Sequence, residues 1–226
     1  MELTMVLAYL EDLKKNNNRD WFNTNKSRYV AAKEEFELFV NNLIPEIREI
    51  DNSIGVVTAK DCVFRIYRDV RFSTNKEPYK TNMGAYISRD GKKGKFAGYY
   101  IHIEPDNNSF IAAGIHMPDA DTLKEIRIEI MENTDEMKKI INDSKFKNIF
   151  PEIYGEKLKT APKGFPKEFK DIELLKFKSY AIVHKLDDKF VKNETNLKDS
   201  LIDLYKIAHP FNTFINRVIE NISENV

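Results

Sequence analysis

The segment FAGYYIHIEPDNNSFIAAGI, residues 96–115, decides the fold. Phe96–Glu104 and Ser109–Ile115 both alternate in the manner of β-strands, and Pro105–Asn108 forms a turn between them. Strands joined by so short a connection pair antiparallel. The sequence therefore predicts a hairpin within an antiparallel sheet.

Further strand-like runs flank this hairpin. Residues 62–67 and 82–88 precede it, and residues 179–186 form the last strand candidate. The strands concentrate in one block, 61–116, with short connections that include the glycine-containing loop 89–94. We expect a mainly antiparallel sheet with meander topology.

Helical periodicity lies on both sides of the strand block. The N-terminal helices, within 2–49, are expected over 2–15 and 25–49, with Pro45 bending or interrupting the second. The C-terminal part, 119–222, predicts helices over 120–132, 134–142, 197–207 and 211–222, the last two separated by His209-Pro210, and an irregular stretch over 150–173. This order predicts an α+β fold: one domain, 1–226, with helices packed on one face of the sheet.

The central hairpin also permits a prediction of side-chain parity. With an even loop, Ile101 and Ile103 share a face with Phe110 and Ala112. The other face then carries Tyr100, His102 and Glu104 together with Ser109 and Ile111. We expect the first face to pack on helices and the second to present polar groups.

Composition limits the classes of protein. The formal net charge is zero, unlike the basic balance of most nucleic-acid-binding domains. Cys62 is the single cysteine, so no disulfide forms within the chain, and a reducing compartment is favoured. We find no signal peptide and no apolar run of the ~20 residues that a membrane helix needs, and we expect a cytoplasmic protein with no membrane partner.

Cations gather in the segment RIYRDVRFSTNKEPYK, residues 65–80. Over residues 65–95, nine basic and three acidic side chains give a local charge of +6. We expect an anion-binding pocket for a small molecule that carries phosphate or carboxylate, because guanidinium groups match both. The residues expected to bind the ligand are Arg65, Arg68, Arg71, Lys76, Lys80, Tyr67 and Tyr100.

If the protein is an enzyme, His102 is the candidate general acid–base. Its ordinary pKa lies near neutrality, and Glu104 or Tyr100 could orient its ring. Phosphoryl hydrolysis or transfer would suit such a site, because that chemistry depends on positioning and charge stabilisation. We predict no metal and no cofactor, because no metal-ligand spacing is present.

Three alternatives remain open. The cations and aromatic residues could bind nucleic acid, with bases stacking on the rings. The basic segment could instead meet the acidic residues of 119–136, whose balance is −5, in a non-enzymatic protein interaction. Finally, the cluster could be scaffolding, with Asp69 neutralising one or two of the arginines.

The chain resembles the uncharacterised family called domain of unknown function 2461, DUF2461. The resemblance rests on residues 17–22 (NNRDWF), 64–73 (FRIYRDVRFS), 76–80 (KEPYK), 98–105 (GYYIHIEP), 113–118 (AGIHMP) and 158–165 (LKTAPKGF). It extends over about residues 3–220 and supports the prediction of a single domain. It implies no mechanism, cofactor or catalytic residue.

Overall fold

The computed structural model describes the backbone of residues 3–193 and 197–224 and the side chains of residues 3–192 and 197–220. The chain divides into two compact units. Unit 1 contains residues 1–94, 100–111 and 185–202, and unit 2 contains residues 95–99, 112–184 and 203–226. The single domain over 1–226 stays a prediction. Glu2, where the first helix was expected to begin, lies outside the described residues.

A five-stranded antiparallel sheet has the order β1-β2-β3-β5-β4. Its strands are β1 (Met83–Ile87), β2 (Gly98–Ile103), β3 (Ser109–Ile115), β4 (Ile153–Tyr154) and β5 (Tyr180–Leu186). The first three strands form the predicted meander, and the α+β class is confirmed. Strand β4 lies in the stretch expected to be irregular, where Ile153 pairs with Ile182 and Tyr154 with Ala181.

Helices α1 (Thr4–Lys15), α2 (Arg19–Thr24) and α3 (Lys26–Ile50) open unit 1. Asn18 caps α2 by accepting a hydrogen bond from the Trp21 N–H at 2.9 Å. Helix α3 continues through Pro45, so the proline does not interrupt it. The buried stripe of Phe36, Val40, Leu43, Ile44 and Ile47 holds the helix in place despite the missing donor.

The expected strand over residues 62–67 is wrong, because none of the five strands lies there and only Val63 and Tyr67 form isolated antiparallel bridges. Helix α4 covers Ala59–Cys62, because Thr58 and Asp61 form a capping box. Asp61 Oδ2 accepts from the Thr58 N–H and hydroxyl, both at 2.8 Å. The chain becomes extended only from Val63 onward. The remaining unit 1 elements are η1 (Gly91–Lys93), α9 (Asp188–Asn193) and the beginning of α10 (Leu197–Glu224).

Unit 2 holds helices α5 (Ala120–Glu132), α6 (Thr134–Ile141), α7 (Ser144–Ile149), α8 (Ile172–Leu175) and most of α10. The expected break at His209-Pro210 is wrong, since α10 is continuous. Phe211 and Phe214 next to the proline are buried. Asn212 Nδ2 donates to the Gly98 carbonyl at 3.0 Å, and Asn216 bonds both backbone groups of Ala97. Packing and these bonds outweigh the loss of one helical hydrogen bond.

The predicted parity of the central hairpin is wrong by one residue. The rings of His102 and Phe110 stack at 4.4 Å, so these two side chains share a face, while Ile101, Ile103, Ser109 and Ile111 are fully buried. The reason lies in Glu104. Its N–H donates to Ser109 Oγ and its carbonyl accepts from that hydroxyl, both at 3.0 Å, so Glu104 belongs to the connection and not to the ladder. The connection between the two strands therefore contains an odd number of residues, not the even number expected.

Candidate functional site

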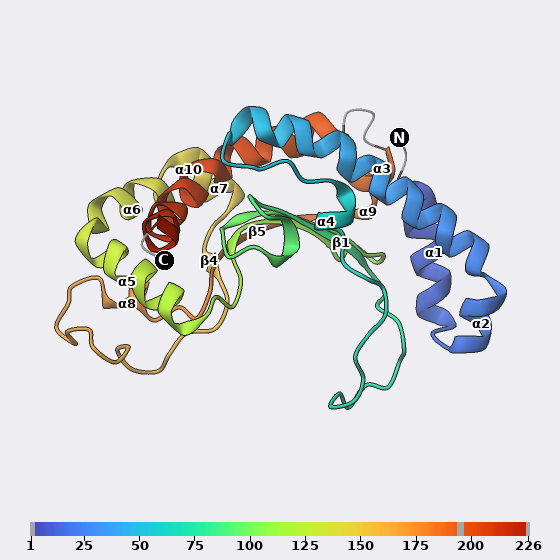
Figure 1. The fold of residues 1–226 in the computed structure, drawn as a ribbon, viewed down its shortest axis with the longest axis horizontal. Helices are drawn as coiled ribbons and strands as arrows, with labels where there is room; N and C mark the ends of the chain where they lie inside the picture. The colour runs from blue at the N-terminus through green and yellow to red at the C-terminus, as the bar shows by residue number, and fades with distance from the viewer. Residues whose placement is uncertain (1–2, 194–196, 225–226) are drawn as a thin grey trace. The chain divides into compact units, whose positions relative to one another are not determined.

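The cationic segment, residues 65–80, forms most of an arm of two antiparallel segments, residues 63–82, whose tip is residues 69–77 (Figure 1, teal). Val63 pairs with Ala85 and Tyr67 with Tyr79. Between these bridges the Phe64 N–H donates to the Gly84 carbonyl at 2.9 Å, and the Lys80 N–H donates to the Ile66 carbonyl at 2.8 Å. The arm is thus a direct extension of β1, and its base lies beside β2.

The arm is fixed at its base to α2. Asn17 Nδ2 donates to the Tyr79 carbonyl at 3.0 Å, and Asn17 Oδ1 accepts from the Tyr79 N–H at 3.2 Å. The Tyr79 ring stacks on Phe22 at 3.9 Å, and Tyr67 approaches both rings, at 5.5 and 5.8 Å. Tyr67 therefore belongs to this aromatic contact, although it is 48% exposed.

A chain of hydrogen bonds, here called the polar row, joins Tyr100, His102 and Glu104. The Tyr100 hydroxyl lies 3.0 Å from His102 Nδ1, and His102 Nε2 lies 3.0 Å from Glu104 Oε2. All three side chains come from one face of β2 and its end, because alternate residues of a strand point the same way. The Phe110 ring covers the imidazole.

Two consecutive residues at the C-terminal end of the arm, Thr81 and Asn82, complete the polar row. The Thr81 hydroxyl donates to Glu104 Oε1 at 2.8 Å, and Asn82 Nδ2 lies 3.3 Å from His102 Nδ1. Gly84 makes room for the Tyr100 phenol, since a Cβ at Gly84 would lie 2.4 Å from the hydroxyl oxygen. Sequence analysis missed Thr81, Asn82 and Gly84, because their roles depend on pairing between the arm, β1 and β2.

The contacts define the protonation of His102. Glu104 is an acceptor, so Nε2 carries the proton, and Nδ1 accepts from Tyr100 and Asn82. Burial lowers the pKa of His102, and the charge of Lys80 acts in the same direction, while Glu104 opposes both. The imidazole is therefore neutral near pH 7. Burial, with the charge of Glu104, raises the pKa of Tyr100 to about 12, which keeps the phenol protonated.

The predicted cations divide into two groups. In the first, Arg71 bonds Asp69 through two nitrogens, at 2.6 and 2.9 Å, as the scaffolding alternative anticipated. Arg68 lies 3.7 Å from Glu77 and 3.4 Å from the Ser73 hydroxyl. Lys76 donates to the Val70 carbonyl at 3.1 Å. These groups belong to the tip or its margin.

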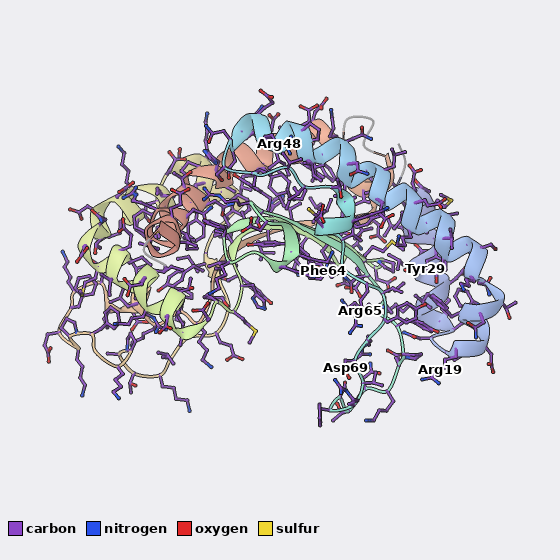
Figure 2. All side chains as sticks on the ribbon, viewed as in Figure 1. Arg19, Tyr29, Arg48, Phe64, Arg65 and Asp69 are labelled. Carbon is purple, nitrogen blue, oxygen red and sulfur yellow. The ribbon has the colours of Figure 1, made fainter. Side chains whose placement is uncertain are left out.

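Arg65 and Lys80 form the second group, at the arm base. Neither forms an ion pair with any carboxylate that the structure describes. Lys80 Nζ lies 5.5 Å from the centre of the Phe64 ring, and that ring meets the edge of Tyr100 at 6.2 Å. Burial lowers the pKa of Lys80, and the charge of Arg65 lowers it further. Figure 2 shows Phe64 and Arg65 near the base of the arm and Asp69 toward the tip.

Lys80 connects the cations to the polar row. The positive charge of Lys80 lowers the pKa of His102, and the positive charge of Arg65 lowers the pKa of Lys80. The structure thus gathers Lys80, Tyr100, His102 and Glu104, with Arg65 at the margin, and leaves Arg71, Lys76 and Tyr67 apart. Three of the acidic residues of 119–136 have partners inside unit 2: Asp119 pairs with Lys95, and Glu129 and Glu136 pair with Arg217.

Three further features of the described residues bear on function: possible metal ligands, possible membrane helices and the single cysteine. Across the described ranges, no group of three or more His, Cys, Asp or Glu side chains has a geometry that could hold a metal ion. No helix in the same ranges combines the length and the apolar character required to span a bilayer. Cys62 is buried, and burial raises the pKa of its thiol to about 11.

Fold and site together define an α+β protein with a tyrosine–histidine–glutamate hydrogen-bond chain on its sheet and a basic arm beside that chain. The chain belongs to the family of conserved hypothetical proteins DUF2461, whose family model matches residues 5–214. No curated protein and no solved structure matches it.

Proposed function

We propose that the arm base and the polar row bind a small molecule that carries a phosphate or carboxylate group, and that the row acts on it as a general acid–base. One observation supports this most directly. Lys80 and Arg65 have no carboxylate partner in the described chain, and the charge of Lys80 acts on a histidine whose Nε2–H is held by Glu104. A buried carboxylate–imidazole–hydroxyl chain is a common arrangement for moving a proton.

The anion would bind to Lys80 and Arg65. Guanidinium groups offer paired donors, and an ammonium group adds a mobile point charge. Since neither group is neutralised by a described carboxylate, a ligand anion would not have to displace one. Arg68 is a weaker contributor, because Glu77 already lies 3.7 Å from its guanidinium. Arg71 is left out of the proposed site, because its Nε and Nη2 both donate to the Asp69 carboxylate.

Proton transfer would run along the polar row. The Tyr100 oxygen would accept a proton from the bound molecule while its own proton moves to His102 Nδ1. Glu104 would stabilise the resulting imidazolium through Nε2–H, and Thr81 would hold the carboxylate in position. The neutral resting state of His102 fits this role, because an acceptor of protons must be unprotonated at working pH.

Thermal unfolding with phosphate, citrate and nucleotides tests the proposal. A ligand at about ten times its Kd adds about 1.4 kcal/mol, or roughly 3–6 °C for a chain of this size. We expect this shift for the wild type and its loss in Arg65→Ala and Lys80→Met. Lys76→Ala at the tip is the matched control and should keep the shift. Absence of a shift at millimolar ligand, or an equal shift in all variants, would overturn the proposal.

A separate observation favours nucleic acid as a second candidate. Phe72 at the arm tip is 96% exposed, and the Arg71 guanidinium lies 5.9 Å from its ring centre. Exposed aromatic and guanidinium groups are suited to stacking on unpaired bases. Fluorescence anisotropy with labelled single-stranded DNA and RNA should show binding that weakens steeply with salt and falls in Phe72→Ala. Binding that is absent, or equal in that variant, removes this candidate.

A further inference from the structure

The geometry points to Lys80 as a residue that forms an imine with the carbonyl carbon of its ligand. We propose that the ligand is an aldehyde or ketone that also carries a phosphate or carboxylate group. This inference rests on the proposed anion site and narrows its substrate class. Three features of Lys80 carry it: its lack of a carboxylate partner, its fixed backbone position, and its place beside the polar row.

Several lysines of the described chain are held by acids. Lys14 lies 2.7 Å from Asp106, Lys192 lies 3.0 Å from Glu11, and both pKa values are raised by those carboxylates. An ammonium held in this way stays protonated and is a poor nucleophile. Lys80 is half-buried against the Phe64 ring, with only the cation Arg65 acting on its charge. A lysine in such surroundings is the type that carbonyl chemistry uses.

The backbone of Lys80 is also fixed. Its N–H is bonded to the Ile66 carbonyl across the arm. Thr81 and Asn82 follow directly and bond Glu104 and His102. The Cα of Lys80 is therefore within two residues of Thr81 and Asn82, whose side chains orient the polar row. Lys80 Nζ lies over the Phe64 ring, and that ring contacts the Tyr100 ring of the polar row edge-on.

The proposed step is balanced without any further reactant. The neutral amine attacks the carbonyl carbon, and the carbon–oxygen π bond breaks as the oxygen is protonated to give a carbinolamine. Loss of the hydroxyl as water, with loss of the second nitrogen proton, forms the carbon–nitrogen double bond. The polar row can take up and return the protons through Tyr100 and His102. No atom is oxidised or reduced.

Reductive trapping tests the inference. Pyridoxal 5′-phosphate serves as the probe because it carries an aldehyde and a phosphate, and borohydride converts any imine into a stable secondary amine. Peptide mass spectrometry then locates the label. We expect Lys80 to be labelled at least tenfold faster than Lys14 or Lys192 at pH 7. Pyridoxal without the phosphate should label Lys80 more slowly, and inorganic phosphate should protect it.

Lys80→Arg is the decisive variant, because it keeps the cation and removes the nucleophile. Its labelling should fall to the level of the other lysines while its thermal shift with inorganic phosphate is retained. If Lys80 of the wild type is labelled no faster than the other lysines, the imine proposal is overturned. In that case a thermal shift with phosphate would still support the anion site, so the two proposals fail separately.

Discussion

Asn17 holds Tyr79 by both of its backbone groups, with Nδ2 donating to the carbonyl at 3.0 Å and Oδ1 accepting from the N–H at 3.2 Å. The amide side chain thus replaces a neighbouring strand for one residue. It fixes the arm immediately before Lys80. An asparagine in the connection between α1 and α2 therefore determines where a cation of the proposed site lies, although Asn17 and Tyr79 are 62 positions apart.

Replacing Asn17 with alanine should destabilise the protein by about 1–3 kcal/mol, because both backbone groups of Tyr79 lose their partner. Urea unfolding of Asn17→Ala against the wild type measures this. Asn142→Ala is the control, since that exposed amide makes only a local bond to the Lys138 carbonyl. Equal midpoints for the two variants would show that the Asn17 clamp contributes little.

Gly84→Ala should displace the Tyr100 phenol, because the new Cβ would lie 2.4 Å from the hydroxyl oxygen. We expect a loss of about 1–3 kcal/mol, the usual cost of overpacking. The variant should also change the nitrogen chemical shifts of His102, whose Nδ1 accepts from that hydroxyl.

A double-mutant cycle separates this contact from general strain. In a Tyr100→Phe background the oxygen is absent, so the cost of Gly84→Ala should be smaller than in the wild type. The same cost in both backgrounds would mean that the hydroxyl does not set the spacing.

His102 should make stability depend on pH. Its folded pKa is lowered below the ordinary value of 6.5, so the unfolded chain binds the proton more readily. The stability that His102 contributes is therefore complete above about pH 6.5 and is lost as pH falls toward the folded pKa. The slope reaches at most about 1.4 kcal/mol per pH unit for one proton.

Urea midpoints between pH 5 and pH 8 measure this slope for the wild type and His102→Gln. The variant should show a flatter profile over the acidic part of the range. His116→Gln is the control, because His116 is exposed. A wild-type profile that matches that of His102→Gln would contradict the assignment of a neutral imidazole.

Pro210→Ala should stabilise α10, because alanine restores the N–H donor that the helix lacks at this position. The gain is expected to be about 1–3 kcal/mol at this exposed site, given the helix propensities of the two residues. Thermal unfolding checks it. A lower melting temperature would indicate that the proline relieves strain beside the buried Phe211.

Local signals predicted much of the fold. Asp119 caps α5 and the apolar spacing sets its length, so Ala120–Glu132 agrees with the predicted helix. Strand β3, Ser109–Ile115, also matches its prediction. Where prediction failed, a competing interaction was responsible. Thr58 and Asp61 capped a helix at the expected strand, and Ser109 took over the backbone groups of Glu104.

Less of the candidate site than of the fold could be predicted from the sequence. The pairing of Asp69 with Arg71 could be anticipated from their separation of two residues. The link from Tyr100 through His102 to Glu104 follows from alternation along one strand. The environment of Lys80 could not be predicted, because it depends on where the Phe64 ring and Arg65 lie after the arm has paired.

The consecutive residues Lys80, Thr81 and Asn82 have a mechanical consequence. The first is a proposed contact to the guest molecule, and the other two grip the carboxylate and the imidazole. A displacement of the Lys80 backbone would be transmitted to the hydrogen bonds of Thr81 and Asn82, because only two rigid, planar peptide units lie between these residues. Binding of a ligand at Lys80 would therefore change the pKa of His102 through Thr81 and Asn82. Ligand binding and proton transfer would then be coupled without any large motion.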